Sequence, residues 1–120
     1  MKVSTRSLVA LAALVLGLSG ASQWWAARHE AQIGEQVAAL VKPGDIRMLS
    51  STTCGICTAA RRWFEANHVA HSECFIERDA SCRAEFDALR APGTPVLLLR
   101  GQPQLGFNPQ RVLAALQSRG

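Results

Sequence analysis

A chain of 120 residues has room for one compact domain and an appendage, which argues against a second independent core. Hydrophobic residues make up 48% of the chain and charged residues 18%, which excludes a disordered protein. The net charge is +4, but two of the thirteen basic residues, Lys2 and Arg6, precede the first apolar stretch. The rest of the chain has eleven scattered basic residues against nine acidic ones, a balance so near neutral that we exclude nucleic acid as a partner.

Residues 1–27 have the pattern of a signal peptide or a signal anchor. The run from Leu8 to Ala27 carries no charge, and its twenty residues are enough to cross a bilayer. Trp24 and Trp25 would then lie in the outer interfacial belt of the inner membrane. Small residues up to Ala21 also fit cleavage after that position, so removal stays an alternative. In both cases we expect a periplasmic or otherwise extracytoplasmic domain, and we favour the retained anchor.

Residues 28–44 are predicted to form an amphipathic helix or spacer. Apolar residues recur there at helical spacing, and Pro43 and Gly44 end the pattern. These apolar residues are Ile33, Val37, Leu40 and Val41. The sequence leaves open whether this helix docks on the domain or separates it from the membrane.

Residues 45–120 predict one α/β domain with the order βαβαββα. The expected elements are a strand at 46–50, a helix at about 54–66, a strand near 71–76, a helix from 79 or 81 to about 90, strands at 96–99 and 102–106, and a helix at 109–117. Asn67 is expected to end the first of these helices in the left-handed conformation. Phe86 and Leu89 are expected to face the core from the second.

Cys54-Gly55-Ile56-Cys57 has the spacing of a redox-active thiol pair. Because Cys54 directly follows a strand and opens a helix, the positive end of that helix is expected to lower its thiol pKa. Cys57 lies one turn later, within reach and more shielded. Gly55 would let a partner chain approach, and Ile56 offers it an apolar contact.

Zinc sites use the same cysteine spacing, and the chain offers a rival ligand set of Cys54, Cys57, His68 and His71. One helix must occupy most of the interval between the two pairs, and a thiol pair that opens a helix is the redox arrangement. We therefore expect no metal and interpret both histidines as surface or strand-edge residues.

Three motifs together resemble a glutaredoxin-family domain over residues 46–116. They are the Thr-Cys-Gly-Ile-Cys sequence ending at Cys57, Thr94-Pro95-Val96, and Gly106-Phe107-Asn108-Pro109. The last is similar to the motif of the glutaredoxin-like electron donors of ribonucleotide reductase. The combination of Gly93-Thr94-Pro95 with this later Gly-Phe-Asn-Pro motif also resembles the catalytic domain of periplasmic disulfide isomerases. The resemblance implies a thioredoxin fold, whose central mixed sheet has four strands, and a cis-proline at Pro95 that faces the thiols.

The resemblance also implies a thiol–disulfide oxidoreductase that acts on protein or small-thiol partners, with Cys54 as the attacking and Cys57 as the resolving thiol. The expected substrate-binding residues are Gly55, Ile56, Thr94 and Pro95. We expect a monomer without a bound cofactor. Glutathione dependence stays open, because Gly-Ile replaces the usual Pro-Tyr and no Gly-Gly-x-x-Asp signature follows. The alternative is a non-catalytic partner-binding or metal-carrying module on the same fold.

Cys74 and Cys82 lie outside the family pattern. In an oxidising compartment they could close a short loop as a structural disulfide, which we favour over two buried free thiols. A relay that passes electrons to Cys54 and Cys57 is the third interpretation.

Overall fold

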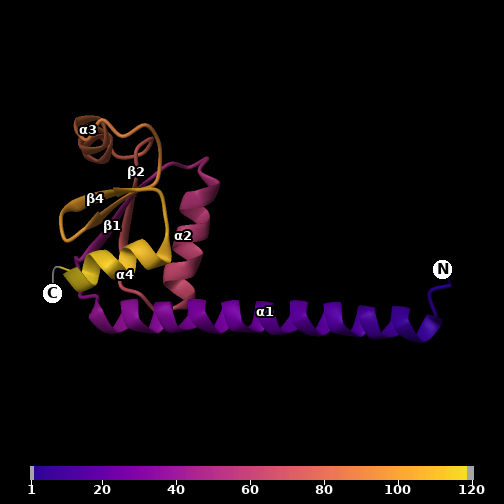
Figure 1. The fold of residues 1–120 in the computed structure, drawn as a ribbon. Coiled ribbons are helices and arrows are strands. Elements are labelled where there is room, and N and C mark those ends of the chain that lie inside the picture. The colour runs from indigo at the N-terminus through magenta and orange to yellow at the C-terminus, as the bar shows by residue number, and fades with distance from the viewer. Residues whose placement is uncertain (1, 119–120) are drawn as a thin grey trace. The chain divides into compact units, whose positions relative to one another are not determined.

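The computed structural model describes residues 2–118, which divide into two compact units between Gln32 and Ile33. The helices and strands are α1 Thr5–Leu40, β1 Ile46–Ser50, α2 Gly55–Ala66, β2 Ser72–Phe75, α3 Ala80–Ala88, β3 Val96–Leu99, β4 Gln102–Leu105 and α4 Pro109–Ser118 (Figure 1). From β1 onward this order confirms the predicted βαβαββα sequence of elements.

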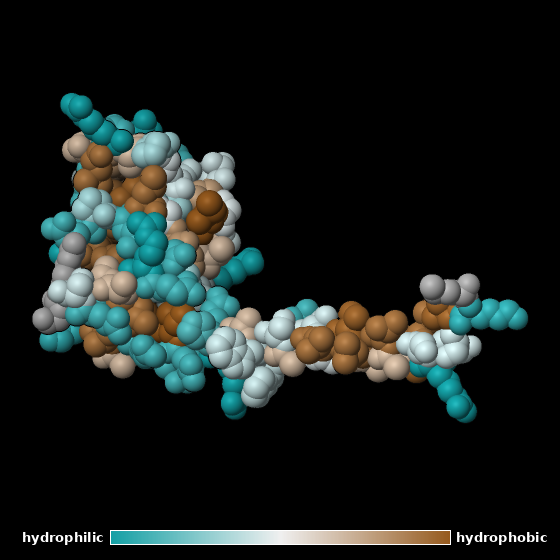
Figure 2. All heavy atoms as spheres, viewed as in Figure 1, coloured by the Kyte–Doolittle hydropathy of each residue, from teal (hydrophilic) through white to brown (hydrophobic). Residues whose placement is uncertain are grey.

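The N-terminal unit consists of the first part of α1. Its apolar side chains are unburied along the helix, as Figure 2 shows, and Leu16 is 73% exposed. The helix is long and apolar enough to cross a membrane, a property that export signals share. Residues that favour helices continue past Ala27, so α1 runs without interruption to Leu40, and the predicted boundary between the signal segment and the amphipathic helix lies within one continuous helix.

The second unit is built on a four-stranded sheet in the order β2-β1-β3-β4. β1 pairs in parallel with β2 and antiparallel with β3, and β3 pairs antiparallel with β4. The turn between β3 and β4 consists of Arg100 and Gly101, with φ of 49° and 84°. Two successive left-handed residues suit the tight hairpin that joins twisted strands.

The main core lies on one face of this sheet, where the end of α1, α2 and α4 pack together. Its largest fully buried side chain is Phe64 of α2. Ile33 and Val37 of α1 are buried in the same core, so the end of α1 docks on the domain. Leu40 was expected on this apolar face, but it is 38% exposed at the last residue of the helix.

A smaller core lies on the opposite face, between the sheet and α3. Leu49, Val96 and Cys82 are its buried members, and Phe86 packs against them as expected. The inward placement predicted for Leu89 is wrong, because α3 ends at Ala88 and leaves the Leu89 side chain exposed.

α2 ends at Ala66, as predicted, but the residue after it is not left-handed. Asn67 has φ of −98°, and the left-handed residue is His68, with φ of 54°. The Asn67 side chain instead donates from Nδ2 to the carbonyl oxygen of Trp63 at 2.9 Å. The same carbonyl oxygen also accepts the backbone N–H of Asn67 at 3.1 Å, so the side-chain bond is a second one to a carbonyl of the last helical turn.

Candidate redox site

Cys54 and Cys57 are joined by a disulfide at the start of α2, with their Cα atoms 5.2 Å apart. Cys54 is the N-cap of the helix and has extended backbone, whereas Cys57 lies within its first turn. Short polar residues lead from β1 to Cys54, so the strand ends and the helix begins at the thiol pair.

The two cysteines differ in exposure and in hydrogen bonding. Cys57 is fully buried and Cys54 is half-buried, so an incoming partner reaches Cys54 first. The backbone N–H of Cys57 donates to Cys54 Sγ at 3.0 Å. A sulfur at the positive end of a helix that accepts an amide hydrogen is stabilised as a thiolate.

Gly55 and Ile56 form the exposed surface of the pair. A Cβ placed on Gly55 would meet nothing within 4 Å, and the Ile56 side chain is 56% exposed. An exposed isoleucine beside a half-buried thiol offers an apolar contact to a partner. Their role in substrate binding stays a prediction.

Pro95 directly precedes β3, is buried, and follows a cis peptide bond from Thr94. Its carbonyl oxygen accepts the backbone N–H of Gly106 at 2.9 Å. This bond joins the Thr94-Pro95 and Gly106-Phe107-Asn108-Pro109 motifs, which lie apart in the sequence. Thr94 is half-buried.

Two carboxylates that the sequence analysis missed hold the residues before Cys54. Glu77 accepts hydrogen bonds from the Ser51 hydroxyl and, at 3.1 Å, from the backbone N–H of Thr52. Glu73 accepts the Ser50 hydroxyl at 2.5 Å. One signal could have found them: parallel strands end at the same edge of a sheet, so acidic residues near the end of β2 lie beside the end of β1.

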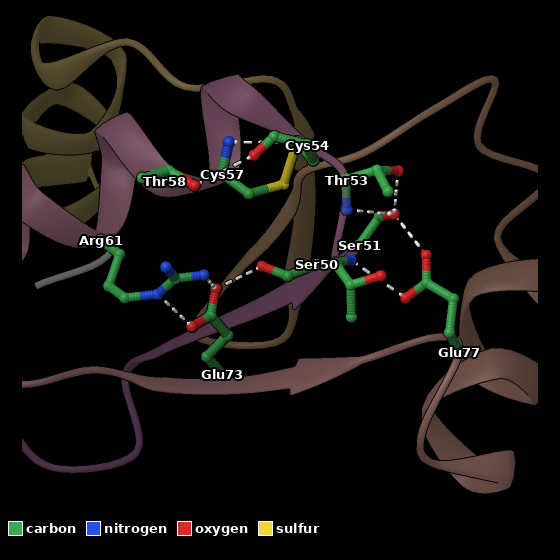
Figure 3. The surroundings of a disulfide bond; sticks show 10 residues. Ser50, Ser51, Thr53, Cys54, Cys57, Thr58, Arg61, Glu73 and Glu77 are labelled. Carbon is green, nitrogen blue, oxygen red and sulfur yellow. Dashed lines mark hydrogen bonds and ion pairs between the residues drawn. A yellow bond between two sulfur atoms is a disulfide. The ribbon is translucent and has the colours of Figure 1, made fainter.

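Arg61 of α2 completes the Glu73 cluster. Its guanidinium donates from Nε at 2.6 Å and from the second terminal nitrogen at 2.9 Å to the two carboxylate oxygens (Figure 3). Burial alone would raise the pKa of Glu73, but the hydrogen bonds from Arg61 and Ser50 outweigh it and lower that pKa below its ordinary value. Glu73 is therefore an ionised, partnered carboxylate beneath α2.

His68 and His71 were the rival metal ligands. His68 is exposed after the end of α2, while His71 packs on the Phe64 ring at 4.9 Å between centroids. The Nδ1 atom of His71 also lies 2.8 Å from the carbonyl oxygen of Val69. Within residues 2–118, no three His, Cys, Asp or Glu side chains gather in a group that could hold a metal ion.

A second disulfide joins Cys74 of β2 to Cys82 of α3, with the Cα atoms 6.1 Å apart. Cys82 is fully buried in the smaller core. Arg47 of β1 donates to Cys74 Sγ at 3.6 Å and forms an ion pair with Glu85 of α3. The bridge and the ion pair both attach α3 to the sheet.

Comparisons with solved structures identify the fold. The thioredoxin-like protein BC3987 aligns with a TM-score of 0.52 at 21% identity, covering 58% of this chain and 97% of that one. A variant of BC3987 gives 0.55 at 21% identity, covering 62% and 96%. Wheat glutaredoxin gives 0.49 at 14% identity, covering 76% and 91%. No family model and no curated protein matches the chain.

The chain therefore has a thioredoxin-like fold with a four-stranded mixed sheet and a long N-terminal helix. A Cys-x-x-Cys pair at the start of α2, close enough to form a disulfide, suggests a redox function on this fold.

Proposed function

We propose that the chain is a thiol–disulfide oxidoreductase that exchanges disulfides with protein or small-thiol partners through Cys54 and Cys57. The observation that carries this proposal is the asymmetry of the pair. Cys54 is reachable, and its sulfur accepts a helix amide, whereas Cys57 is buried and bonded to it. Thiol–disulfide exchange needs one stabilised thiolate and one resolving thiol.

In the reducing direction, the Cys54 thiolate attacks one sulfur of a partner disulfide. A bond forms between that sulfur and Cys54 Sγ, and the second partner sulfur leaves as a thiolate that takes up a proton. Cys57 then loses its proton and attacks Cys54 Sγ, which closes the disulfide seen here and releases the first partner sulfur. The partner gains two electrons and the chain loses two. The reverse sequence oxidises a partner dithiol.

Insulin reduction driven by dithiothreitol tests this function. The full chain is expected to accelerate the reaction, and Cys54→Ser and Cys57→Ser are each expected to abolish the acceleration. The matched control is the double variant Cys74→Ser/Cys82→Ser, which is expected to keep turnover. A second arm with glutathione in place of dithiothreitol measures glutathione dependence.

The same protein preparation separates the rival functions. One metal ion bound per protein molecule, and lost from the Cys54→Ser variant, would establish a metal-carrying module instead. If the protein binds no metal and catalyses no disulfide exchange with either dithiothreitol or glutathione, a partner-binding module would be the remaining function. We expect turnover without bound metal.

We also propose that residues 1–27 anchor the domain outside the cytoplasm. Support comes from the apolar first part of α1 and from the residues that follow it. The Arg28 guanidinium lies 4.5 Å from the centroid of the Trp24 ring, and the His29 ring stacks on Trp25 at 6.0 Å. Tryptophans paired with polar groups at the end of an apolar helix suit the membrane–water interface.

A further inference from the structure

We propose that Glu77 is a positioning residue for Cys54, whose carboxylate fixes the loop that delivers this cysteine to the start of α2. The inference rests on the proposed function of Cys54 and adds to it a residue that does not touch the reacting sulfur atoms.

A short chain of hydrogen bonds connects Glu77 to Cys54. Figure 3 shows its links from Glu77 to Ser51 and from Ser51 to Thr53. The Glu77 carboxylate accepts the Ser51 hydroxyl and the Thr52 backbone N–H. The Ser51 hydroxyl oxygen then accepts the backbone N–H of Thr53 at 3.4 Å. The Ser51 carbonyl oxygen accepts the backbone N–H of Cys54 at 3.3 Å. Ser51 is therefore held by Glu77 on one side and holds Cys54 on the other.

The parallel pairing of β1 and β2 explains why Glu77 reaches this loop. The ladder continues beyond the strands, since the backbone N–H of Ile76 donates to the Ser50 carbonyl oxygen at 3.0 Å. Glu77, the next residue, then lies opposite Ser51, the residue after Ser50. The Glu73 carboxylate is shared with Arg61, whereas Glu77 gives both oxygens to the loop.

The loop depends on these bonds because it has no apolar side chain to pack. Its residues 51–53 are Ser, Thr and Thr, and the two threonines are exposed. An exposed hydrogen bond contributes little to global stability, so its loss is expected to act locally. The hydrogen bond from Ser51 is the largest influence on the Glu77 carboxyl and lowers its pKa, so Glu77 is an ionised acceptor at neutral pH.

The test is the pH profile of Cys54 alkylation in the reduced full chain. Glu77→Ala is expected to raise the Cys54 pKa and to slow alkylation at neutral pH roughly threefold to tenfold, because a misplaced sulfur loses the helix amide. Glu77→Gln is expected to fall between Ala and the unmodified chain, since its amide oxygen keeps one acceptor. Asp87→Asn, an exposed carboxylate change on α3, is the control and is expected to leave the profile unchanged.

The direction of the effect separates positioning from simple charge. If Glu77 acted only as a negative charge, Glu77→Ala and Glu77→Gln would lower the Cys54 pKa equally and speed alkylation. Ser51→Ala removes one of the two bonds that Glu77 makes to the loop, so it is expected to shift the profile in the same direction as Glu77→Ala but less far. Combining the two is expected to add nothing beyond Glu77→Ala, because the bond that Ser51→Ala removes is already lost there.

Faster or unchanged alkylation in Glu77→Ala overturns the proposal, as do additive effects of Ser51→Ala and Glu77→Ala. Insulin reduction by the unmodified chain is measured alongside. If that activity is absent, the oxidoreductase function fails; if it is present while alkylation does not respond to Glu77, only the positioning role fails.

Discussion

Gly34 of α1 lies so close to Asn67 at the end of α2 that a Cβ on Gly34 would come within 1.9 Å of Asn67 Oδ1. The Asn67 side chain is fixed in turn by its bond to the Trp63 carbonyl oxygen. Gly34 is buried between Ile33 and Val37, the two core residues of α1. The absence of a side chain at Gly34 therefore permits the close approach of the two helices.

Gly34→Ala is expected to lower the free energy of unfolding by about 1–3 kcal/mol, the usual cost of overpacking. Alanine gains about 1 kcal/mol of helix propensity over glycine, which the overlap with Asn67 outweighs. Urea denaturation of the full chain measures the change. Gly34→Ala should lower the free energy of unfolding much less when it is added to an Asn67→Ala background, because the new Cβ then meets only the Cβ of residue 67, at 3.1 Å. A single Gly34→Ala variant as stable as the unmodified chain would contradict this account.

Replacing Cys74 and Cys82 by serine is expected to lower stability by roughly 2–3 kcal/mol, because the cross-link closes a short loop in the unfolded chain. Turnover should persist, since these residues lie outside the Cys54/Cys57 pair. The midpoint of thermal unfolding and the insulin assay are measured on the same samples. A large loss of turnover at unchanged stability would favour an electron relay over a structural bridge.

Acid is expected to weaken the domain partly through Glu73. Because its folded pKa lies below the ordinary value, the unfolded chain binds a proton more readily than the folded one. The stabilisation is complete above the ordinary pKa and is lost as the pH falls through the folded pKa. Unfolding free energy measured from about pH 7 to pH 3 should therefore fall less steeply in Glu73→Gln than in the unmodified chain. Equal slopes would remove Glu73 as a contributor, and Asp87→Asn serves as the control.

The membrane anchor predicts an intact N-terminus. The full chain should stay in the membrane fraction after an alkaline wash, and its mass should include residues 1–27. A soluble mature chain that begins at Ser22 would show cleavage instead. A reporter enzyme that works only outside the cytoplasm is expected to be active when it is fused to the C-terminus.

The element order of the domain could be predicted because each element has a local signal. Val96 to Leu99 is an uninterrupted apolar run, Pro109 starts α4, and Asp79 caps α3 by accepting the N–H groups of Ser81 and Cys82. The placement of Cys54 at a helix start followed from the same patterns.

The errors concern features that local patterns do not determine. Helical spacing alone placed Leu89 inward and Leu40 on the apolar face of its helix, but both lie at helix ends and are exposed. Glu73 and Glu77 carry no motif; they matter because β2 is parallel to β1, a pairing between distant segments. Gly34 likewise became meaningful only once Asn67 was placed against it.

Capture of mixed disulfides tests the central claim most directly. A thiol that has attacked a partner disulfide stays bonded to it until the second thiol resolves the intermediate, so Cys57→Ser should trap partners on Cys54. Cys54→Ser should trap almost nothing, because Cys57 is buried. The two variants are compared by non-reducing electrophoresis and mass spectrometry after extraction from cells. The account predicts a strong, reductant-sensitive set of adducts with Cys57→Ser alone; the same faint, reductant-insensitive set from both variants would contradict it.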